Sequence, residues 1–149
     1  MDATPAPGVT CLFTGDDPSS RLGEADVDDG VVVARSGPYD LSGHADVRVE
    51  VQRWFGNRDL GEDPGDFFRL EIRHDAASPD VLLEELGSSI SQASWTPVNF
   101  RVADFVEPGA GVELKVSVAD GASTGNIIEA AIDEILFWEP RCEIHDPPP

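Results

Sequence analysis

The chain has 149 residues, and its 29 Asp and Glu outnumber its 10 Lys and Arg, which gives a formal net charge of −19 at pH 7. A chain this acidic repels a nucleic-acid backbone and an anionic membrane, so we expect neither as a partner. The sequence contains no run of 18 apolar residues, so we expect no segment that inserts into a membrane. The length allows one domain with a true core, which we expect over residues 1–140, followed by an extended, proline-rich tail over 141–149.

Short apolar segments separated by turns fill the sequence. In the clearest of them apolar and polar residues alternate, which is typical of a half-buried strand. Pro97 indicates an edge strand or a position early in the strand, because proline cannot donate a hydrogen bond to a neighbouring strand. The segment 81–86 is expected to be a paired strand, although a single helical turn is an alternative. The expected strands cover residues 10–14, 31–34, 46–55, 67–73, 81–86, 95–102 and 111–120.

The last apolar segment, 127–137, organises the rest of the chain. Its apolar residues alternate from Ile128 to Ile132 and continue at the other parity at Ile135 and Phe137. Part of this segment alone would also suit a helix, but the strands that precede it favour a strand here. With about eight to ten short strands and no convincing helix, the sequence predicts an all-β fold, an antiparallel β-sandwich or jelly roll.

Acidic residues form two features that could bind a cation. In the turn before the second expected strand, Asp26 and Asp28 alternate as in half of a calcium loop, although a solvated turn is the alternative. On the last strand, Asp133 is either a hydrogen-bonded or exposed acid, or a metal ligand. Glu129 lies on the same face four residues earlier, and it could share that site or pair with Arg53, which we prefer.

The two cysteines, Cys11 and Cys142, lie near opposite ends of the chain. Their spacing matches no metal motif, so we expect a disulfide that joins the two ends, with two free thiols as the alternative. A disulfide would place the protein in an oxidising compartment.

Aromatic side chains offer a possible ligand surface. Trp54, Phe55 and Trp95 are the candidates for binding a sugar, with Trp138 and Tyr39 as further ones. Aromatic residues make up only 7% of the chain, so each could instead belong to the core.

Catalytic motifs are missing from the sequence. The three histidines show no metal-binding spacing, and neither Gly-x-Ser-x-Gly nor a suitably placed Cys and His pair occurs. Two of the 29 carboxylates could in principle serve as the acid pair of a glycoside hydrolase, but nothing in the sequence singles out one pair. We therefore expect no enzyme activity.

A series of short motifs runs along nearly the whole chain, from about residue 2 to residue 138. They are, in order, Cys11–Gly15, Ala25–Gly30, Ser36–Gly43, Arg53–Asn57, Pro64–Phe67, Ser94–Trp95, Phe100–Asp104 and Ile128–Glu134. In this order and spacing they resemble the MAM-like jelly-roll module of secreted bacterial proteins. That module is commonly appended to zinc carboxypeptidases and to immune-inhibitor-A-type metalloproteases.

The resemblance implies a secreted or cell-surface, non-catalytic module with a galactose-binding-like jelly roll. It also implies a structural calcium held by Asp26, Asp28 and Asp133, with Glu24 and Asp29 as substitutes. The partner would be an adjacent catalytic domain or a cell-surface polysaccharide. A carbohydrate- or surface-adhesion module and a structural spacer or assembly subunit are the alternatives. The turn over 73–77 departs from the family's pattern, and the family usually has a further strand upstream of the position of residue 1.

Overall fold

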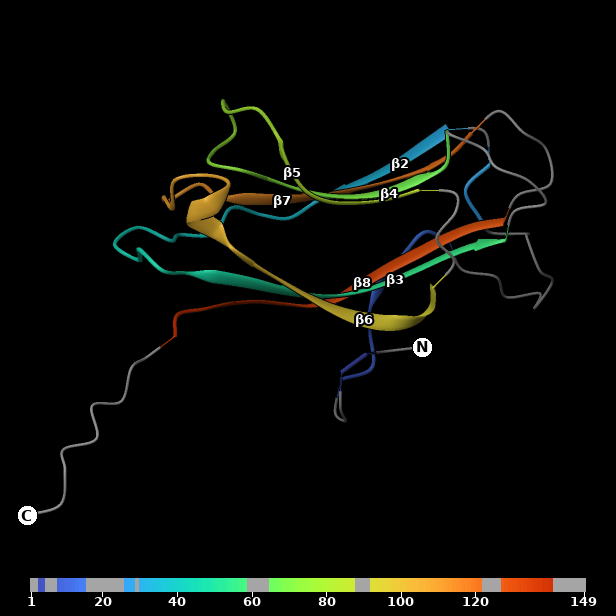
Figure 1. The fold of residues 1–149 in the computed structure, drawn as a ribbon, viewed down its shortest axis with the longest axis horizontal. Coiled ribbons are helices and arrows are strands. Elements are labelled where there is room, and N and C mark those ends of the chain that lie inside the picture. The colour runs from blue at the N-terminus through green and yellow to red at the C-terminus, as the bar shows by residue number, and fades with distance from the viewer. Residues whose placement is uncertain are drawn as a thin grey trace, which may run out of the picture.

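The computed structural model describes residues 3–4, 8–15, 26–28, 30–58, 65–87, 92–121 and 127–140. Two antiparallel four-stranded sheets pack face to face as a β-sandwich (Figure 1), which confirms the predicted fold class. Sheet A has the strand order β1-β8-β3-β6, and sheet B has the order β2-β7-β4-β5. The elements are β1 (Leu12–Phe13), β2 (Gly30–Arg35), β3 (Arg48–Arg58), β4 (Phe67–Arg73), β5 (Val81–Gly87), β6 (Gln92–Arg101), the 3₁₀ helix η1 (Val102–Asp104), β7 (Glu113–Asp120) and β8 (Ile127–Trp138).

The expected strands are all present, with shifts of a few residues at their ends. The segment that begins at Val81 is a strand paired with β4 and not a helical turn. Pro97 lies on β6, which is an edge strand of sheet A, as its missing N–H group requires. Among the described residues, no helix is long and apolar enough to cross a membrane.

The core lies between the two sheets, and strand alternation fills it. Val49 and Val51 of β3 are fully buried, and so are Phe68 and Ile72 of β4. The ring of Phe55 packs against that of Phe68, with centroids 5.9 Å apart. The apolar parity of each strand therefore decides which of its side chains form the core and which face outward from the sandwich.

A bulge in β8 explains why its apolar parity changes. The register with β3 shifts between the pairs Glu50–Leu136 and Gln52–Asp133, so β8 contains one extra residue there. Glu134, in this bulge, has a φ of 49°. The extra residue changes which parity faces inward, so that Ile135 and Phe137 pack against the core while Leu136 is exposed.

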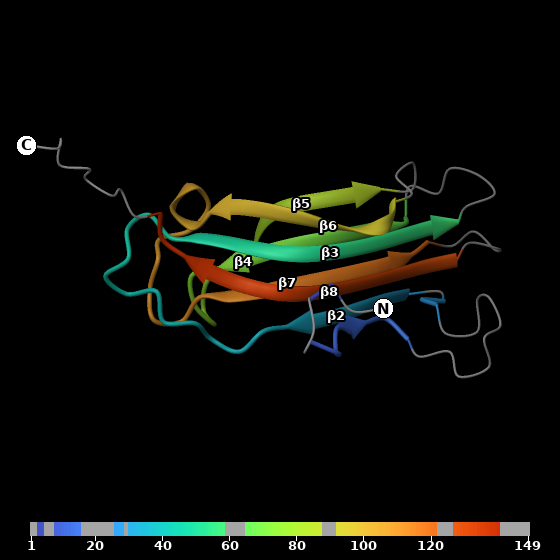
Figure 2. The same cartoon turned by 90° about the horizontal axis from the view of Figure 1, so that it is seen from below.

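The last strand lies beside the first described strand. Leu12 of β1 pairs with Ile132 of β8, and the N–H of Val27 donates to the carbonyl oxygen of Ile128 at 3.0 Å. These contacts place β8 between β1 and β3 in sheet A (Figure 2).

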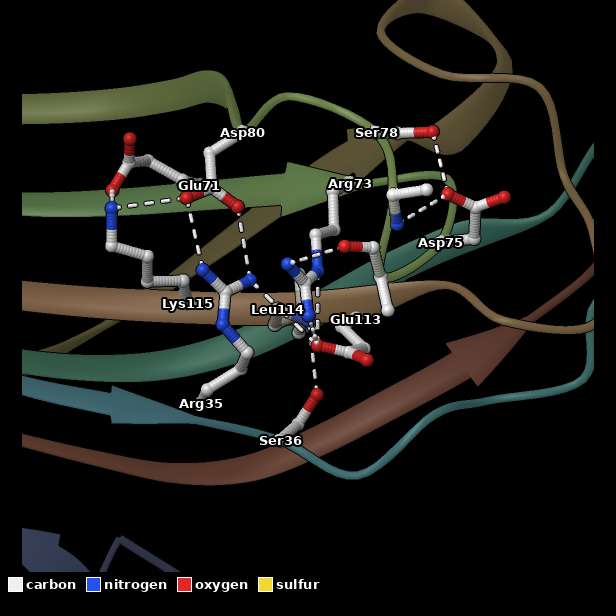
Figure 3. Close-up of polar contacts among 12 residues, drawn as sticks. Arg35, Ser36, Glu71, Arg73, Asp75, Ser78, Asp80, Glu113, Leu114 and Lys115 are labelled. Carbon is white, nitrogen blue, oxygen red and sulfur yellow. Dashed lines mark hydrogen bonds and ion pairs between the residues drawn. The ribbon is translucent and has the colours of Figure 1, made fainter.

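The outer face of sheet B carries a network of ion pairs (Figure 3). Arg35 of β2 forms two hydrogen bonds of 2.9 Å with Asp80, just before β5. Lys115 of β7 lies 3.1 Å from Asp80 and 2.8 Å from Glu71 of β4. The network joins the four strands of this sheet through charged side chains. The outer face of sheet A is different, because it holds a pocket lined by aromatic side chains.

Candidate functional site

An open pocket of about 680 Å³ lies on the outer face of sheet A. Side chains from all four strands of the sheet, or from residues next to them, contribute to its lining. The lining includes Phe13, Trp54, Ser94, Trp95, Glu129 and Ala131.

The register of the strands brings the three aromatic residues together. Phe13 pairs with Ala131, and Ala131 pairs in turn with Trp54 on its other side. Trp95 directly precedes Thr96, the partner of Arg53, so it lies beside Trp54 across the next strand boundary. Neighbouring strands are about 4.8 Å apart, so Phe13 and Trp54 flank the small Ala131 at a backbone separation of about 10 Å. The pocket is therefore a trough with aromatic walls and a floor that includes alanine.

Gly56 provides the space that the Trp54 ring occupies. A Cβ atom added to Gly56 would lie 2.7 Å from Cη2 of Trp54 and 3.2 Å from its Cζ3. The indole ring therefore extends along β3 over Gly56, whose partner on β8 is Glu129. A glycine inside a strand often marks such a close approach. The ring is thus held close to the strand, with its six-membered end toward the position of Glu129.

The described lining of the pocket combines flat apolar faces with one carboxylate. Trp54 and Trp95 are half-buried, and Phe13 is 49% exposed, so solvent and ligands can reach them. Glu129 is exposed, between the buried Ile128 and Ala130, so its side chain points outward. Such a surface can stack against a flat ligand that is apolar on one face, while the carboxylate accepts hydrogen bonds from donors at the ligand's edge.

The structure divides the sequence-predicted aromatic candidates. Trp54 and Trp95 line the same pocket. The prediction that Phe55 binds a ligand is wrong, because Phe55 is fully buried on the opposite face of β3. Tyr39 packs on Phe137, with ring centroids 4.5 Å apart.

Two other aromatic residues differ from the prediction, because Trp138 lies away from the pocket and Phe13 lines it. Trp138 is 37% exposed, but it pairs with Arg48 near the far end of β3, away from the pocket. Sequence reasoning missed Phe13, although it places a strand there. The sequence shows only that Phe13 is an aromatic residue on a very short strand. Its pairing with Ala131 in the structure shows that its side chain faces the trough.

The acids predicted to bind calcium do not all come together. Val27, between Asp26 and Asp28, bonds to Ile128, and Asp133 follows five residues later on β8, about 16 Å along an extended strand. Asp133 instead accepts hydrogen bonds from the N–H groups of Ala3 at 3.0 Å and Glu134 at 2.8 Å. The prediction that Asp133 completes the calcium site is wrong, and its other interpretation as a hydrogen-bonded acid agrees with the contacts.

The remaining members of the predicted calcium set are only partly described. Glu24 and Asp29 lie outside the described residues. Asp26 has a buried Oδ1 atom without a hydrogen-bond partner. Burial raises the pKa of Asp26, and the nearby charge of Asp28 raises it further. In the described part of the chain, no three His, Cys, Asp or Glu side chains form a group that could hold a metal ion.

Arg53 forms an ion pair between the two sheets. Its Nε lies 2.6 Å from Oε2 of Glu84, and its Nη2 lies 2.8 Å from Oε1. Arg53 is 4% exposed and points inward from β3, whereas Glu129 points outward from β8. The prediction that Arg53 pairs with Glu129 is therefore wrong, and Glu129 stays available to the pocket.

The predicted disulfide stays untested. Cys11 is partly buried and lines the pocket, next to β1. Cys142 lies outside the described residues.

No family model matches the sequence, and no curated protein matches it significantly. The resemblance to the MAM-like module, together with the secretion and the absence of catalysis that it implies, therefore stays a prediction.

Proposed function

We propose that this chain is a non-catalytic binding module whose ligand is a carbohydrate. The observation that carries the proposal is the pocket in which Phe13, Trp54 and Trp95 lie together on the outer face of one sheet. A pyranose ring has an apolar face of C–H groups and an edge of hydroxyl groups. The indole faces would stack on the C–H face of the sugar, and the Glu129 carboxylate would accept hydrogen bonds from its hydroxyl groups.

Exposure of the aromatic rings favours this function over a purely structural one. A spacer would bury its tryptophans in the core or cover them with a second subunit. Here the trough is open, with aromatic side chains partly accessible on it. A monomer rarely keeps such apolar surface exposed unless the surface binds something.

Tryptophan fluorescence during titration with a panel of polysaccharides and oligosaccharides tests the proposal. We expect saturable quenching or enhancement by at least one of them, and a loss of binding of at least tenfold in W54A and in W95A. W138A is the matched control, because Trp138 lies on β8 away from the pocket, and it should bind like the wild type. If no sugar binds, or if W138A alone loses binding, the proposal fails.

We also propose that calcium binds at the turn of Asp26 and Asp28, without Asp133. The unsatisfied Oδ1 of Asp26 supports this, because a cation would compensate a buried carboxylate oxygen beside a second negative charge. Calcium would stabilise the turn where it joins β8.

Calorimetry with calcium tests the cation site. We expect heat of binding and a rise in melting temperature with the wild type and with D133N, and neither with D26N. Binding that D133N abolishes, or no change in melting temperature when a chelator is added, would contradict the calcium proposal.

The wider role that we propose is that of an accessory module of a secreted or cell-surface bacterial protein, which holds a neighbouring catalytic domain near a polysaccharide. The resemblance in sequence supports this role. A protease domain encoded in the same reading frame would support it further, and a protein retained inside the cell would contradict it.

A further inference from the structure

The charge of the pocket restricts the class of sugar it can accept. Among the described residues that line the pocket, Glu129 supplies a carboxylate, and none is Lys, Arg or His. Arg53, which precedes Trp54 on β3, points inward and forms hydrogen bonds with Glu84 between the two sheets. The described lining thus offers no cation to balance an anionic ligand.

The position of Glu129 allows its charge to act on a bound ring. Gly56 is its partner on β3, and the Trp54 ring covers Gly56. A ring stacked on Trp54 therefore lies within one strand spacing of Glu129, about 5 Å at the backbone. At that range a charge on the sugar interacts with the carboxylate, and added salt weakens the interaction because Glu129 is exposed.

The charge of the whole chain acts in the same direction. A net charge of −19 produces a negative field that slows the approach of acidic polymers and favours that of cationic ones.

We propose that the pocket selects neutral and amino sugars and rejects uronic acids and sulfated sugars, with Glu129 as the residue that determines this selectivity. The inference rests on the proposed carbohydrate binding and narrows its ligand class. An amino sugar would donate from its ammonium group to the Glu129 carboxylate, a charge-assisted hydrogen bond. A uronate would bring a second carboxylate to a place where the described lining supplies no counter-charge.

The experiment compares three soluble hexamers, of glucose, of glucosamine and of galacturonic acid, by calorimetry at about pH 6 and low salt. We expect the glucosamine hexamer to bind about fivefold more tightly than the glucose hexamer, and the galacturonic acid hexamer not to bind. The preference for glucosamine should shrink at about 0.5 M NaCl, because salt screens exposed charges.

The variant E129Q should reduce the ratio of the glucose and glucosamine dissociation constants to below twofold. The control is E50Q, which removes the same charge from β3 of the same sheet at a position paired with Leu136, away from the pocket. E50Q should keep the ratio of the wild type, which separates a local effect from that of net charge.

The outcomes distinguish a failure of the selectivity inference from a failure of the proposed carbohydrate binding. If the galacturonic acid hexamer binds as tightly as the others, or if E129Q keeps the wild-type ratio, the selectivity inference is wrong while carbohydrate binding stands. If none of the hexamers binds and the polysaccharide panel is also negative, both are wrong.

Discussion

At the scale of single residues, Gly56 decides how the Trp54 ring is presented. A methyl group at Gly56 would collide with the ring at 2.7 Å. We expect G56A to turn the Trp54 ring and to weaken sugar binding at least fivefold, while the protein stays folded because Ala suits a strand better than Gly. Titration with a sugar that the wild type binds measures the effect.

The control for this substitution is G87A. A Cβ atom at Gly87 would meet nothing within 4 Å, so this variant should bind as the wild type does. Unchanged binding by G56A would mean that the orientation of Trp54 does not matter for the ligand.

The contrast between Trp54 and Phe55 shows what alternation predicts. The period of two that places Val49 and Val51 inward also places Phe55 inward and Trp54 outward when it is continued. The alternation within the expected strand 46–55 therefore separates Trp54 from Phe55, although both were predicted to bind a ligand. In contrast, the face of Phe13 depends on pairing between residues more than 100 positions apart, which no local pattern reveals.

At the scale of elements, the ion-pair network joins the strands of sheet B. The hydrogen bonds from Arg35 lower the pKa of Asp80 to about 2 from its ordinary value of 3.8, and Lys115 contributes to the same effect. Because the pKa in the folded state lies below that of the unfolded chain, Asp80 stabilises the fold above pH 4, and this contribution is lost as the pH falls toward 2.

The variant D80N tests this contribution. At pH 7 we expect it to lower the free energy of unfolding by about 1–2 kcal/mol, after allowance for solvent screening, and the difference from the wild type should shrink through pH 2 and vanish below it. Urea unfolding across this pH range measures it. D104N is the control, because the Asp104 side chain is 59% exposed beside Arg101 and should contribute less than about 0.5 kcal/mol. An equal loss in both variants, or one independent of pH, would contradict the role of Asp80.

The elements themselves could largely be predicted from the sequence, and the change of parity in β8 was visible in it. Its cause was not, because the extra residue at Glu134 is defined only against the partner strand β3. The wrong assignment of Asp133 as a calcium ligand also arises because the strand register is not visible in the sequence. The resemblance implies that Asp133 meets the Asp26 turn, but the distance along β8 between them depends on the register.

At the scale of the whole molecule, the two sheets have different outer faces. Sheet B carries a network of ion pairs beside exposed valines of β2, whereas the described lining of the trough on sheet A has three aromatic residues and one outward carboxylate. The chain can present these rings because the sandwich draws enough apolar core from other residues, among them Val51, Leu70 and Ile128. One sheet therefore stabilises the fold, and the other offers the surface that we propose for binding.

The most direct test of this account is an NMR titration of the indole N–H resonances of the three tryptophans with a sugar from the panel. We expect the signals of Trp54 and Trp95 to shift together and to saturate, and the signal of Trp138 to stay in place. Signals that do not move with any sugar, or a shift confined to Trp138, would contradict the assignment of the outer face of sheet A as the binding surface.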